Sequence, residues 1–329
     1  MIKTYLDLAL LCHPVLAFLT MSRPKVQQTK STFAPYFLFS FLSILAIRYS
    51  SSFFSFSQPT SAPLLEACQT YDQPNPIAEL YPNNATGTLN GTVAIVPISM
   101  ALARSVIPAK YRILEHAWRS LLPGFPEGMY PAVLQAMHDH EVQAFGYKIP
   151  DFTRAGIEFP FLDLLGDNIT SFKWAPSLLM TAGHEIALKG AMDYGTNVFA
   201  SVFDPPCDAY RAVPGSKDAT FFSAKSSEAS VRSQFTLAES NYPLSFFKNV
   251  TNQPTFADGK SCDNMIRLFD TSVTVAPNSI ESVRGTVKVK IPPFQSEMEW
   301  KDVYGLRMDT AFIENNYLPC ENFRGYGSG

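Results

Sequence analysis

The sequence predicts a mainly β (α+β) protein with a few short helices, and three observations support this class. The apolar segments 159–165 and 186–188 are too short for free-standing helices and are bounded by Gly, Asp and Asn, so both are predicted to be strands. Residues 286–291 alternate Thr or Lys with Val or Ile, which is the period of a strand. The chain also holds 26 Phe and 25 Pro among its 329 residues, which suits a loop-rich β protein with an aromatic interior.

The same criteria predict the other elements. Strands are expected at 91–97, at 131–145 and within 234–247, and segments 265–275 and 282–291 are expected to pair as antiparallel neighbours. Residues 181–183 stand where a tight hairpin turn would precede the strand at 186–188. Two helices are expected, one at 99–106 with Ser99 as its N-cap, and one at 111–122, where apolar residues recur at helical spacing.

The chain divides into four predicted parts: a signal peptide or signal-anchor region at 1–62, an extended arm at 63–89, a single domain at 90–320 and a disordered tail at 321–329. In the first part, basic residues at 23–30 precede the apolar run 36–47, and small polar residues follow it, which is the order of a signal peptide. A further apolar run at 6–19 leaves open a true start at Met21, an extension of the gene model, or an anchor that stays attached. Neither run reaches the ~20 residues of a spanning helix.

Sequons and cysteines also favour the secretory pathway. Glycosylation sequons begin at Asn84, Asn90, Asn168 and Asn249. Once a signal is removed, Cys68, Cys207, Cys262 and Cys320 remain, an even number that suits two disulfides. Three pairings are possible, and the sequence does not choose among them. We therefore expect a secreted or secretory-pathway glycoprotein, with membrane contact only if the N-terminal region is retained.

Charge excludes one class of partner. The chain has a formal net charge of −3, but five of its 26 basic residues and only one of its 29 acidic residues precede residue 63, so the remainder has a net charge of −7. A mildly acidic body has no electrostatic footprint for nucleic acid. No phosphate-binding loop, dinucleotide glycine fingerprint or nucleophile elbow occurs, and we expect no cofactor.

One stretch, 156–206, has a recognisable order of residues. Glu158 precedes an apolar strand, Gly166 follows that strand, Gly190 begins a further run, and Tyr194-Gly195 lies within it. Upstream, Asn90–Pro97 and Met100–Pro108 have the form of a strand followed by a short helix that ends at a proline. Together these segments resemble the acetoacetate decarboxylase family between Asn90 and Pro206. The resemblance implies a largely antiparallel β-barrel or double cone that encloses one ligand-sized cavity, and action on a small organic acid or ketone.

The run after Gly190 departs from the family pattern. The family's Gly-Arg-Glu-x-aromatic-Gly-x-Pro-Lys run is matched at its glycines and aromatic residue, but Ala191 and Met192 replace Arg and Glu, Asn197 replaces Pro, and Val198 and Phe199 stand at the lysine positions. The family's lysine forms a Schiff base with the substrate, and valine forms no imine. We therefore expect the fold without the usual lysine chemistry, and a pocket that prefers a neutral or weakly polar ligand.

Glu158 and Lys189 are the predicted catalytic residues. Glu158 would face an apolar cavity, where burial raises the pKa of a carboxyl and suits it to proton transfer. Lys189 would project into the cavity if it shares a strand face with Glu185, and a buried lysine there could form an imine. Lys173 is a weaker alternative. The resemblance also makes Tyr194, Asn197, Val198 and Phe199 candidate ligand contacts.

Two functions remain as alternatives to a decarboxylase-like lyase or hydro-lyase. One is a non-catalytic protein that binds a small molecule. The other is a metal-dependent enzyme, since His138 and His140 would point the same way on a strand and His184 would add a third nitrogen. Chance clustering of histidines in a polar strand is the commoner explanation, so no metal is expected. The sequence leaves the substrate and the oligomeric state open.

Overall fold

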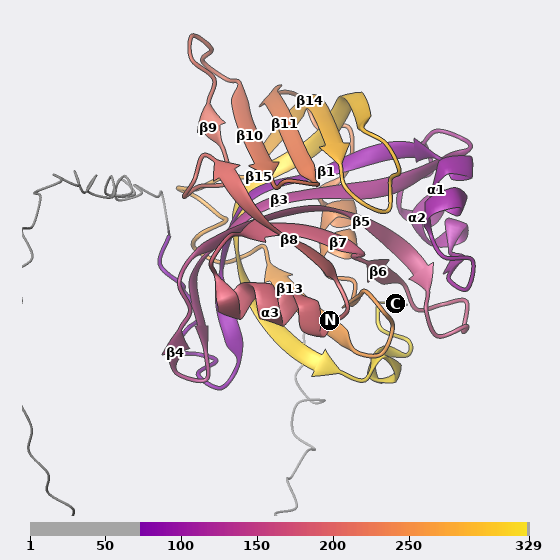
Figure 1. Ribbon diagram of the computed structural model, residues 1–329, viewed down its shortest axis with the longest axis horizontal. Helices are drawn as coiled ribbons and strands as arrows, with labels where there is room; N and C mark the ends of the chain where they lie inside the picture. The colour runs from indigo at the N-terminus through magenta and orange to yellow at the C-terminus, as the bar shows by residue number, and fades with distance from the viewer. Residues whose placement is uncertain (1–72, 328–329) are drawn as a thin grey trace, which may run out of the picture. The chain divides into compact units, whose positions relative to one another are not determined.

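Strands take up more of residues 73–327 than helices do, and these are the residues that the computed structural model describes (Figure 1). The strands are β1 (Ala85–Ser99), β2 (Arg112–Ile113), β3 (Met129–Ala144), β4 (Tyr147–Lys148), β5 (Phe152–Asp163), β6 (Phe172–Trp174), β7 (Ser177–Thr181), β8 (Asn197–Asp204), β9 (Arg211–Ala212), β10 (Thr220–Lys225), β11 (Ser230–Leu237), β12 (Thr255–Phe256), β13 (Cys262–Leu268), β14 (Glu281–Lys290) and β15 (Met298–Leu318). The helices are α1 (Met100–Val106), α2 (Glu115–Leu121), α3 (Glu185–Asp193) and α4 (Leu244–Thr251), with a 3-10 turn at Cys320–Phe323.

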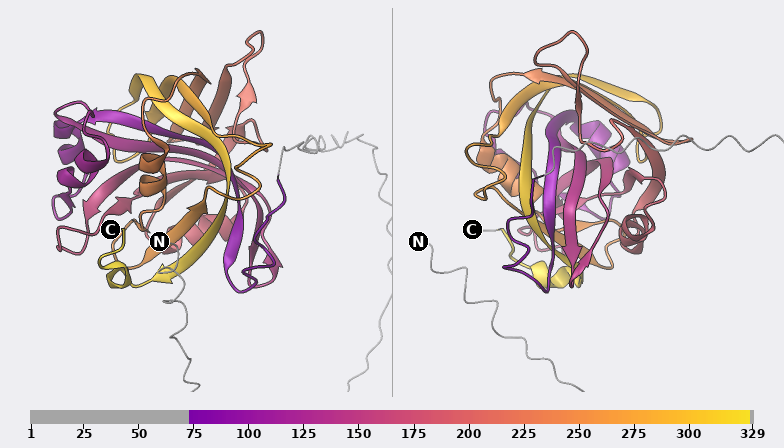
Figure 2. Two further views of the ribbon diagram at one scale, coloured as in Figure 1. Left: turned by 180° about the vertical axis from the view of Figure 1, so that it is seen from behind. Right: turned by 90° about the vertical axis from the view of Figure 1, so that its left-hand side faces the viewer.

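The strand pairings close on themselves in two circuits. One runs β5–β6–β12–β13–β15–β1–β3 and back to β5, and the other runs β5–β7–β8–β10–β11–β14–β15–β1–β3 and back to β5. Figure 2 shows the shared strands β1, β3, β5 and β15 curving through both. The predicted mainly β class is confirmed, although the sheet follows two linked circuits and not one regular barrel. The pairings β7–β8 and β6–β12 are parallel, and the others are antiparallel.

Aromatic side chains fill the interior, as the composition indicated. Trp118 of α2 packs edge-on against Tyr130 of β3 and tilts against Phe161 of β5, and Phe161 stacks on Phe246 of α4. All four side chains are fully buried. Such ring contacts add to the apolar area that each side chain removes from water, so they fix the two helices against the sheet.

The helix at 99–106 is confirmed, because α1 begins after Ser99, whose side chain accepts a hydrogen bond from the N–H of Leu102. The strand predicted at 186–188 is wrong. These residues lie in α3, where the side chain of His184 accepts a hydrogen bond from the N–H of Ala187. The helix connects β7 to β8, which run parallel, and a parallel pair needs a crossover of this length. The hairpin predicted at 181–183 is therefore wrong as well.

Three further expectations differ from the structure. The strand β14 pairs with β11 and β15 and not with 265–275. The strand β1 begins at Ala85, inside the predicted arm, because Thr86 and Thr88 are buried on its inner face. Residues 321–327 are not a free tail: Cys320 forms a disulfide with Cys262, and Arg324 pairs with Glu321 and Asp167. Residues 328–329 and the signal region lie outside the described residues.

Among the residues that the structure describes, no helix has the length and apolar character needed to span a membrane.

Candidate functional site

A cavity of about 480 Å³ lies between β3, β5, β6, β7, α3, β13 and β15. Its polar lining residues include Gln135, Asp139, Arg154, Glu158, Lys173, Asp263, Arg267 and Glu314. The rest of the lining is mainly apolar and includes Val142, Ile149, Phe152, Leu178, Met180, Ile186 and Phe312. The volume and the mixture of apolar walls with a few convergent polar groups are those of a small-molecule site.

An ion pair between Lys173 and Glu158 forms the centre of the polar group. Lys173 Nζ lies 3.0 Å from Glu158 Oε2 and donates a second hydrogen bond to the carbonyl oxygen of Thr251, at 3.1 Å. Gln135 Nε2 also donates to Glu158 Oε2. Lys173 is 4% exposed and Glu158 is 8% exposed. Both strands place these side chains: Lys173 is the central residue of β6, between the buried rings of Phe172 and Trp174, and β6 pairs with β5.

Burial and pairing act differently on the two partners. Burial raises the pKa of Glu158, but the charge and hydrogen bond of Lys173 outweigh it, so the pKa of Glu158 lies below its ordinary value. The expectation of a raised pKa at Glu158 was wrong because it left out this counter-charge. Burial lowers the pKa of Lys173 by more than the attraction of Glu158 raises it, and Arg267 lowers it further. Lys173 is thus a buried amine that gives up its proton more easily than a lysine in water.

Two arginines surround this pair. Arg154 Nε donates to Asp139 Oδ2 at 2.8 Å, and Arg267 Nη2 donates to Gln135 Oε1. Arg267 is 3% exposed, and its Nε and Nη1 have no hydrogen-bond partner among the described residues. Burial and the charge of Arg154 lower the pKa of Arg267 to about 10. Two nitrogens of a buried guanidinium therefore lack the acceptor that a ligand would supply.

Asp263 and Glu314 form an acid pair on the neighbouring strands β13 and β15. Burial raises the pKa of Asp263 to about 6, and burial together with the charge of Asp263 raises the pKa of Glu314 well above its ordinary value. Two buried carboxyls in contact share a proton, because both cannot ionise at low cost.

The structure brings some predicted contacts into the cavity and leaves others outside. Tyr194 lines it, and its hydroxyl accepts a hydrogen bond from the N–H of Tyr317, whose ring stacks on it at 4.7 Å. Asn197, Val198 and Phe199 on β8 are not among the lining residues. Asn197 is exposed, and Phe199 packs against the main apolar core. The positions of the family's lysine thus hold residues that turn away from the cavity.

Lys189 lies on α3 at the rim of the cavity, and not on a strand. Its side chain is 71% exposed and pairs with Asp193, one helical turn away. The hydrogen bond that Lys189 donates to the carboxylate of Asp193 raises the pKa of Lys189. Lys189 is therefore an exposed amine that holds its proton, whereas imine formation requires a buried amine that loses its proton easily. Lys173 has those properties.

The three histidines of the metal hypothesis have separate roles. The buried rings of His138 and His140 stack at 5.9 Å, His138 Nδ1 contacts Thr153 Oγ1, and His140 Nε2 lies 3.5 Å from Asp309 Oδ2. His184 caps α3 and its Nε2 contacts the carbonyl oxygen of Pro150. No group of three His, Cys, Asp or Glu residues within 73–327 could hold a metal ion.

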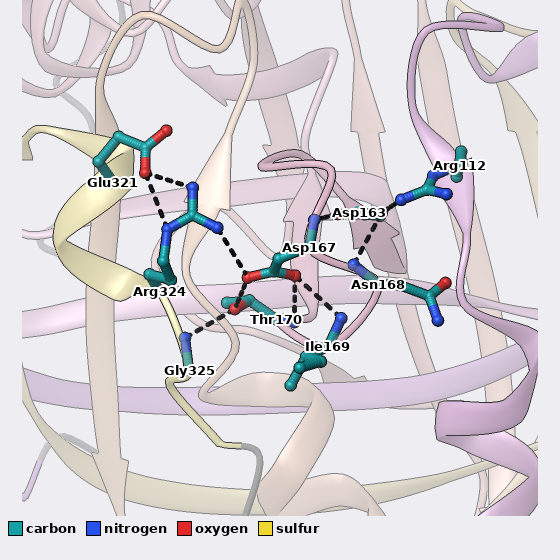
Figure 3. Close-up of polar contacts among 9 residues, drawn as sticks. All are labelled: Arg112, Asp163, Asp167, Asn168, Ile169, Thr170, Glu321, Arg324 and Gly325. Carbon is teal, nitrogen blue, oxygen red and sulfur yellow. Dashed lines mark hydrogen bonds and ion pairs between the residues drawn. The ribbon is translucent and has the colours of Figure 1, made fainter.

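The sequons differ in how their asparagines are placed. Asn168 is exposed on the loop after β5, while its sequon residue Thr170 is buried and bonded to Asp167 and to the N–H of Gly325 (Figure 3). Asn90 lies within β1 and donates to Asp208 Oδ1 at 3.0 Å. Asn249 is part of α4 and accepts from Gln253. Asn84 precedes β1 and is partly exposed. Cys207 is disulfide-bonded, and Cys68 lies outside the described residues.

Most of the site was not found from sequence. Arg154, Asp263, Arg267 and Glu314 lie on three different strands that only the fold brings together. Lys173 did carry a signal: it is the one charged residue between two large aromatic residues in a short apolar segment, and a lysine buried on such a strand needs a partner.

Known proteins give a limited comparison. No protein-family model and no curated protein matches the chain. Solved structures similar to it include an acetoacetate decarboxylase-like enzyme from Sphingomonas wittichii RW1, with a TM-score of 0.40 and 6% identity over 72% of this chain and 94% of that one. The enduracididine biosynthesis enzyme MppR is similar in two structures. The one complexed with the condensation product of pyruvate and imidazole 4-carboxaldehyde has a TM-score of 0.38 and 10% identity over 70% of this chain and 87% of that one. The structure with HEPES buffer bound has a TM-score of 0.40 and 11% identity over 79% of this chain and 97% of that one.

The first of these proteins bears the family name that the sequence resemblance gave. At such identities and TM-scores the matches say nothing about residues, substrate or reaction, so the functional argument rests on the geometry of the cavity.

Proposed function

We propose that this protein binds a small organic acid or ketone in the cavity and forms an imine with it through Lys173. One observation carries this proposal: a lysine that is 4% exposed, has a lowered pKa and sits beside a carboxylate lines a ligand-sized cavity. A lysine amine is nucleophilic only when neutral, and burial is a common way to make it so.

The neighbouring groups supply the proton transfers that imine formation needs. Lys173 Nζ transfers a proton to Glu158, and its lone pair attacks the carbonyl carbon. The carbonyl oxygen takes up the proton from Glu158 to give a carbinolamine. Glu158 then takes the second proton from the nitrogen and passes it to this hydroxyl, which leaves as water while the nitrogen lone pair forms the C=N bond. The protonated imine then withdraws electrons from the adjacent carbon, as a lyase or hydro-lyase requires.

A second function is favoured by one contact. The hydrogen bond from Lys173 Nζ to the carbonyl oxygen of Thr251, together with the pairing to Glu158, stabilises the charged ammonium. A charged lysine would hold an anionic ligand without reacting with it, which is the behaviour of a non-catalytic binding protein. Arg267, which has two nitrogens without a hydrogen-bond partner among the described residues, also favours an anionic ligand over the neutral one expected from the sequence.

Reductive trapping distinguishes the two functions. The protein is incubated with pyruvate or acetoacetate and then with borohydride, and the intact mass is measured. The imine proposal predicts a stoichiometric adduct on the wild-type protein and on Lys189→Met, but none on Lys173→Met. Equal, slow labelling of all three proteins would leave only the binding function.

We also propose that the chain enters the secretory pathway and is glycosylated. The order of the N-terminal segments, the exposed Asn168 and the Cys262–Cys320 disulfide support this. Protein from a eukaryotic secretory host should lose apparent mass on glycosidase treatment and should show no free thiol without reductant. Unchanged mobility together with titratable thiols would contradict the proposal.

A further inference from the structure

The cavity is longer than a four-carbon acid requires. Glu158 and Phe152 both line it and lie six residues apart on β5, which is about 20 Å of strand. Arg154 lies between these two residues on β5, and it is paired with Met180 of β7 in the strand register. The polar head of the site at Glu158 and Lys173 therefore occupies one end of an elongated space.

A set of apolar side chains lines the cavity between that head and the surface. We call it the apolar track and define it as Leu178, Met180, Phe152, Ile149 and Ile186, all of which line the cavity. Leu178 lies next to Gly156, one level beyond Glu158 on β5. Met180 follows at the level of Arg154, then Phe152, which faces Asp139 in the register. Ile149 lies on the connection between β4 and β5, where its N–H donates to the carbonyl oxygen of Val142.

The track ends at the surface. Ile186 lies on the first turn of α3 and is 60% exposed, although its side chain also lines the cavity. The five side chains of the apolar track give water no hydrogen-bond partners, so an apolar chain packs against them more favourably than water does, beside the Arg154–Asp139 ion pair that lines the cavity at the level of Met180 and Phe152. An open end would let that chain extend beyond the protein.

The head of the site is suited to a charged or polar group. Arg267 is 3% exposed and has Nε and Nη1 without a partner among the described residues, and it lies beside Gln135, which also contacts Glu158. A carboxylate at this position would accept a hydrogen bond from one of the two free nitrogens and would be attracted by the charge of the guanidinium.

We infer that the ligand is amphiphilic: an oxo acid whose carboxylate and carbonyl lie at Arg267 and Lys173, and whose alkyl chain lies along the apolar track to Ile186. The position of the carbonyl rests on the proposed function, whereas the position of the chain rests on the track alone. The substrate class is thus medium-chain oxo acids, which the cavity should bind more tightly than it binds pyruvate or acetoacetate.

The test uses the whole protein and measures affinity for straight-chain 2-oxo acids of four, six, eight and ten carbons. Each added methylene buried in the track should strengthen binding by about fourfold until the chain passes the mouth. Ile186→Asp should weaken binding of the two longest acids and leave the shortest unchanged. The matched control is Val202→Asp, which changes another exposed apolar residue on β8 that does not line the cavity and should leave all four affinities unchanged.

The outcomes separate this inference from the proposed function. Affinity independent of chain length, or an equal response of Ile186→Asp and Val202→Asp, would overturn the amphiphilic ligand. Borohydride trapping of the same acids reports on Lys173 independently. A steep chain-length dependence without an adduct would support the amphiphilic ligand and refute the imine. An adduct without chain-length dependence would support the imine and refute the amphiphilic ligand.

Discussion

Lys173 Nζ lies 3.0 Å from Glu158 Oε2, and the two residues are 4% and 8% exposed. Their strands, β6 and β5, are paired in the sheet, so backbone hydrogen bonds hold the two residues in place before any ligand arrives. A buried ion pair of this kind is costly to desolvate and is poor evidence of stabilisation by itself. Its position in the wall of a cavity gives it a chemical use.

Removing one partner of this pair should destabilise the protein strongly. Glu158→Gln leaves the ammonium of Lys173 buried without its counter-charge, and we expect a loss of about 3–5 kcal/mol in the free energy of unfolding at pH 7, measured by denaturant titration. In the double variant Glu158→Gln, Lys173→Met no buried charge is left unpaired, so most of that loss should be recovered. A loss below about 1 kcal/mol in the single variant would show that the pair behaves as an exposed one.

Stability should depend on pH through Asp263. Its pKa is about 6 in the folded protein and near 3.9 in an unfolded chain, so between these values the folded state binds more protons. The stability that this group contributes is therefore present below about pH 4 and is lost as the pH rises toward 6. Asp263→Asn should flatten this part of the curve of unfolding free energy against pH. Asp302→Asn, at an exposed position of β15, is the control and should not change the slope. An unchanged slope in Asp263→Asn would refute the raised pKa.

Two glycine substitutions test the secondary structure. Gly190 lies inside α3, and an added Cβ would meet no atom within 4 Å, so Gly190→Ala should stabilise the protein by about 0.5–1 kcal/mol. Gly285 lies on β14, where an added Cβ would stand 1.9 Å from the carbonyl oxygen of Gln234. Gly285→Ala should cost about 2 kcal/mol or more. Thermal unfolding of both variants measures this, and a destabilised Gly190→Ala would contradict the helix.

The sequons should not be used equally. Asn168 is exposed, whereas Asn90 lies in the middle of β1 and is bonded to Asp208. In protein from a secretory host, Asn168→Gln should remove one glycan from the mass spectrum, and Asn90→Gln should remove none. The reverse result would show that glycosylation does not follow the exposure of these side chains in the folded chain.

Sequence reasoning located elements whose signals are local. The N-cap at Ser99, the strand at 131–145 and the apolar stretch after Glu158 all depend on residues close in the chain, and the structure has them near the expected positions. The strand predicted at 186–188 was wrong because the prediction used only three apolar residues. The helix that contains them runs from Glu185 to Asp193 and is capped by His184, so a longer stretch of sequence determines the structure there.

The site itself depends on contacts between distant segments. Gln135 and Arg267 touch across 132 positions of sequence, and Lys173 meets Thr251 across 78. Nothing local to these residues predicts such pairs. The resemblance to the family pattern placed the lysine position at 198–199, on β8. The buried lysine that lines the cavity is Lys173, which lies 25 residues before Val198 on β6.

Peptide mapping of the reduced adduct tests the central claim most directly. The protein is incubated with a 2-oxo acid and borohydride, digested, and sequenced by tandem mass spectrometry. The account predicts that the adduct lies on Lys173, and that prior addition of a non-reactive fatty acid reduces its yield by occupying the cavity. An adduct on Lys189 or on another exposed lysine, with Lys173 unmodified, would contradict it.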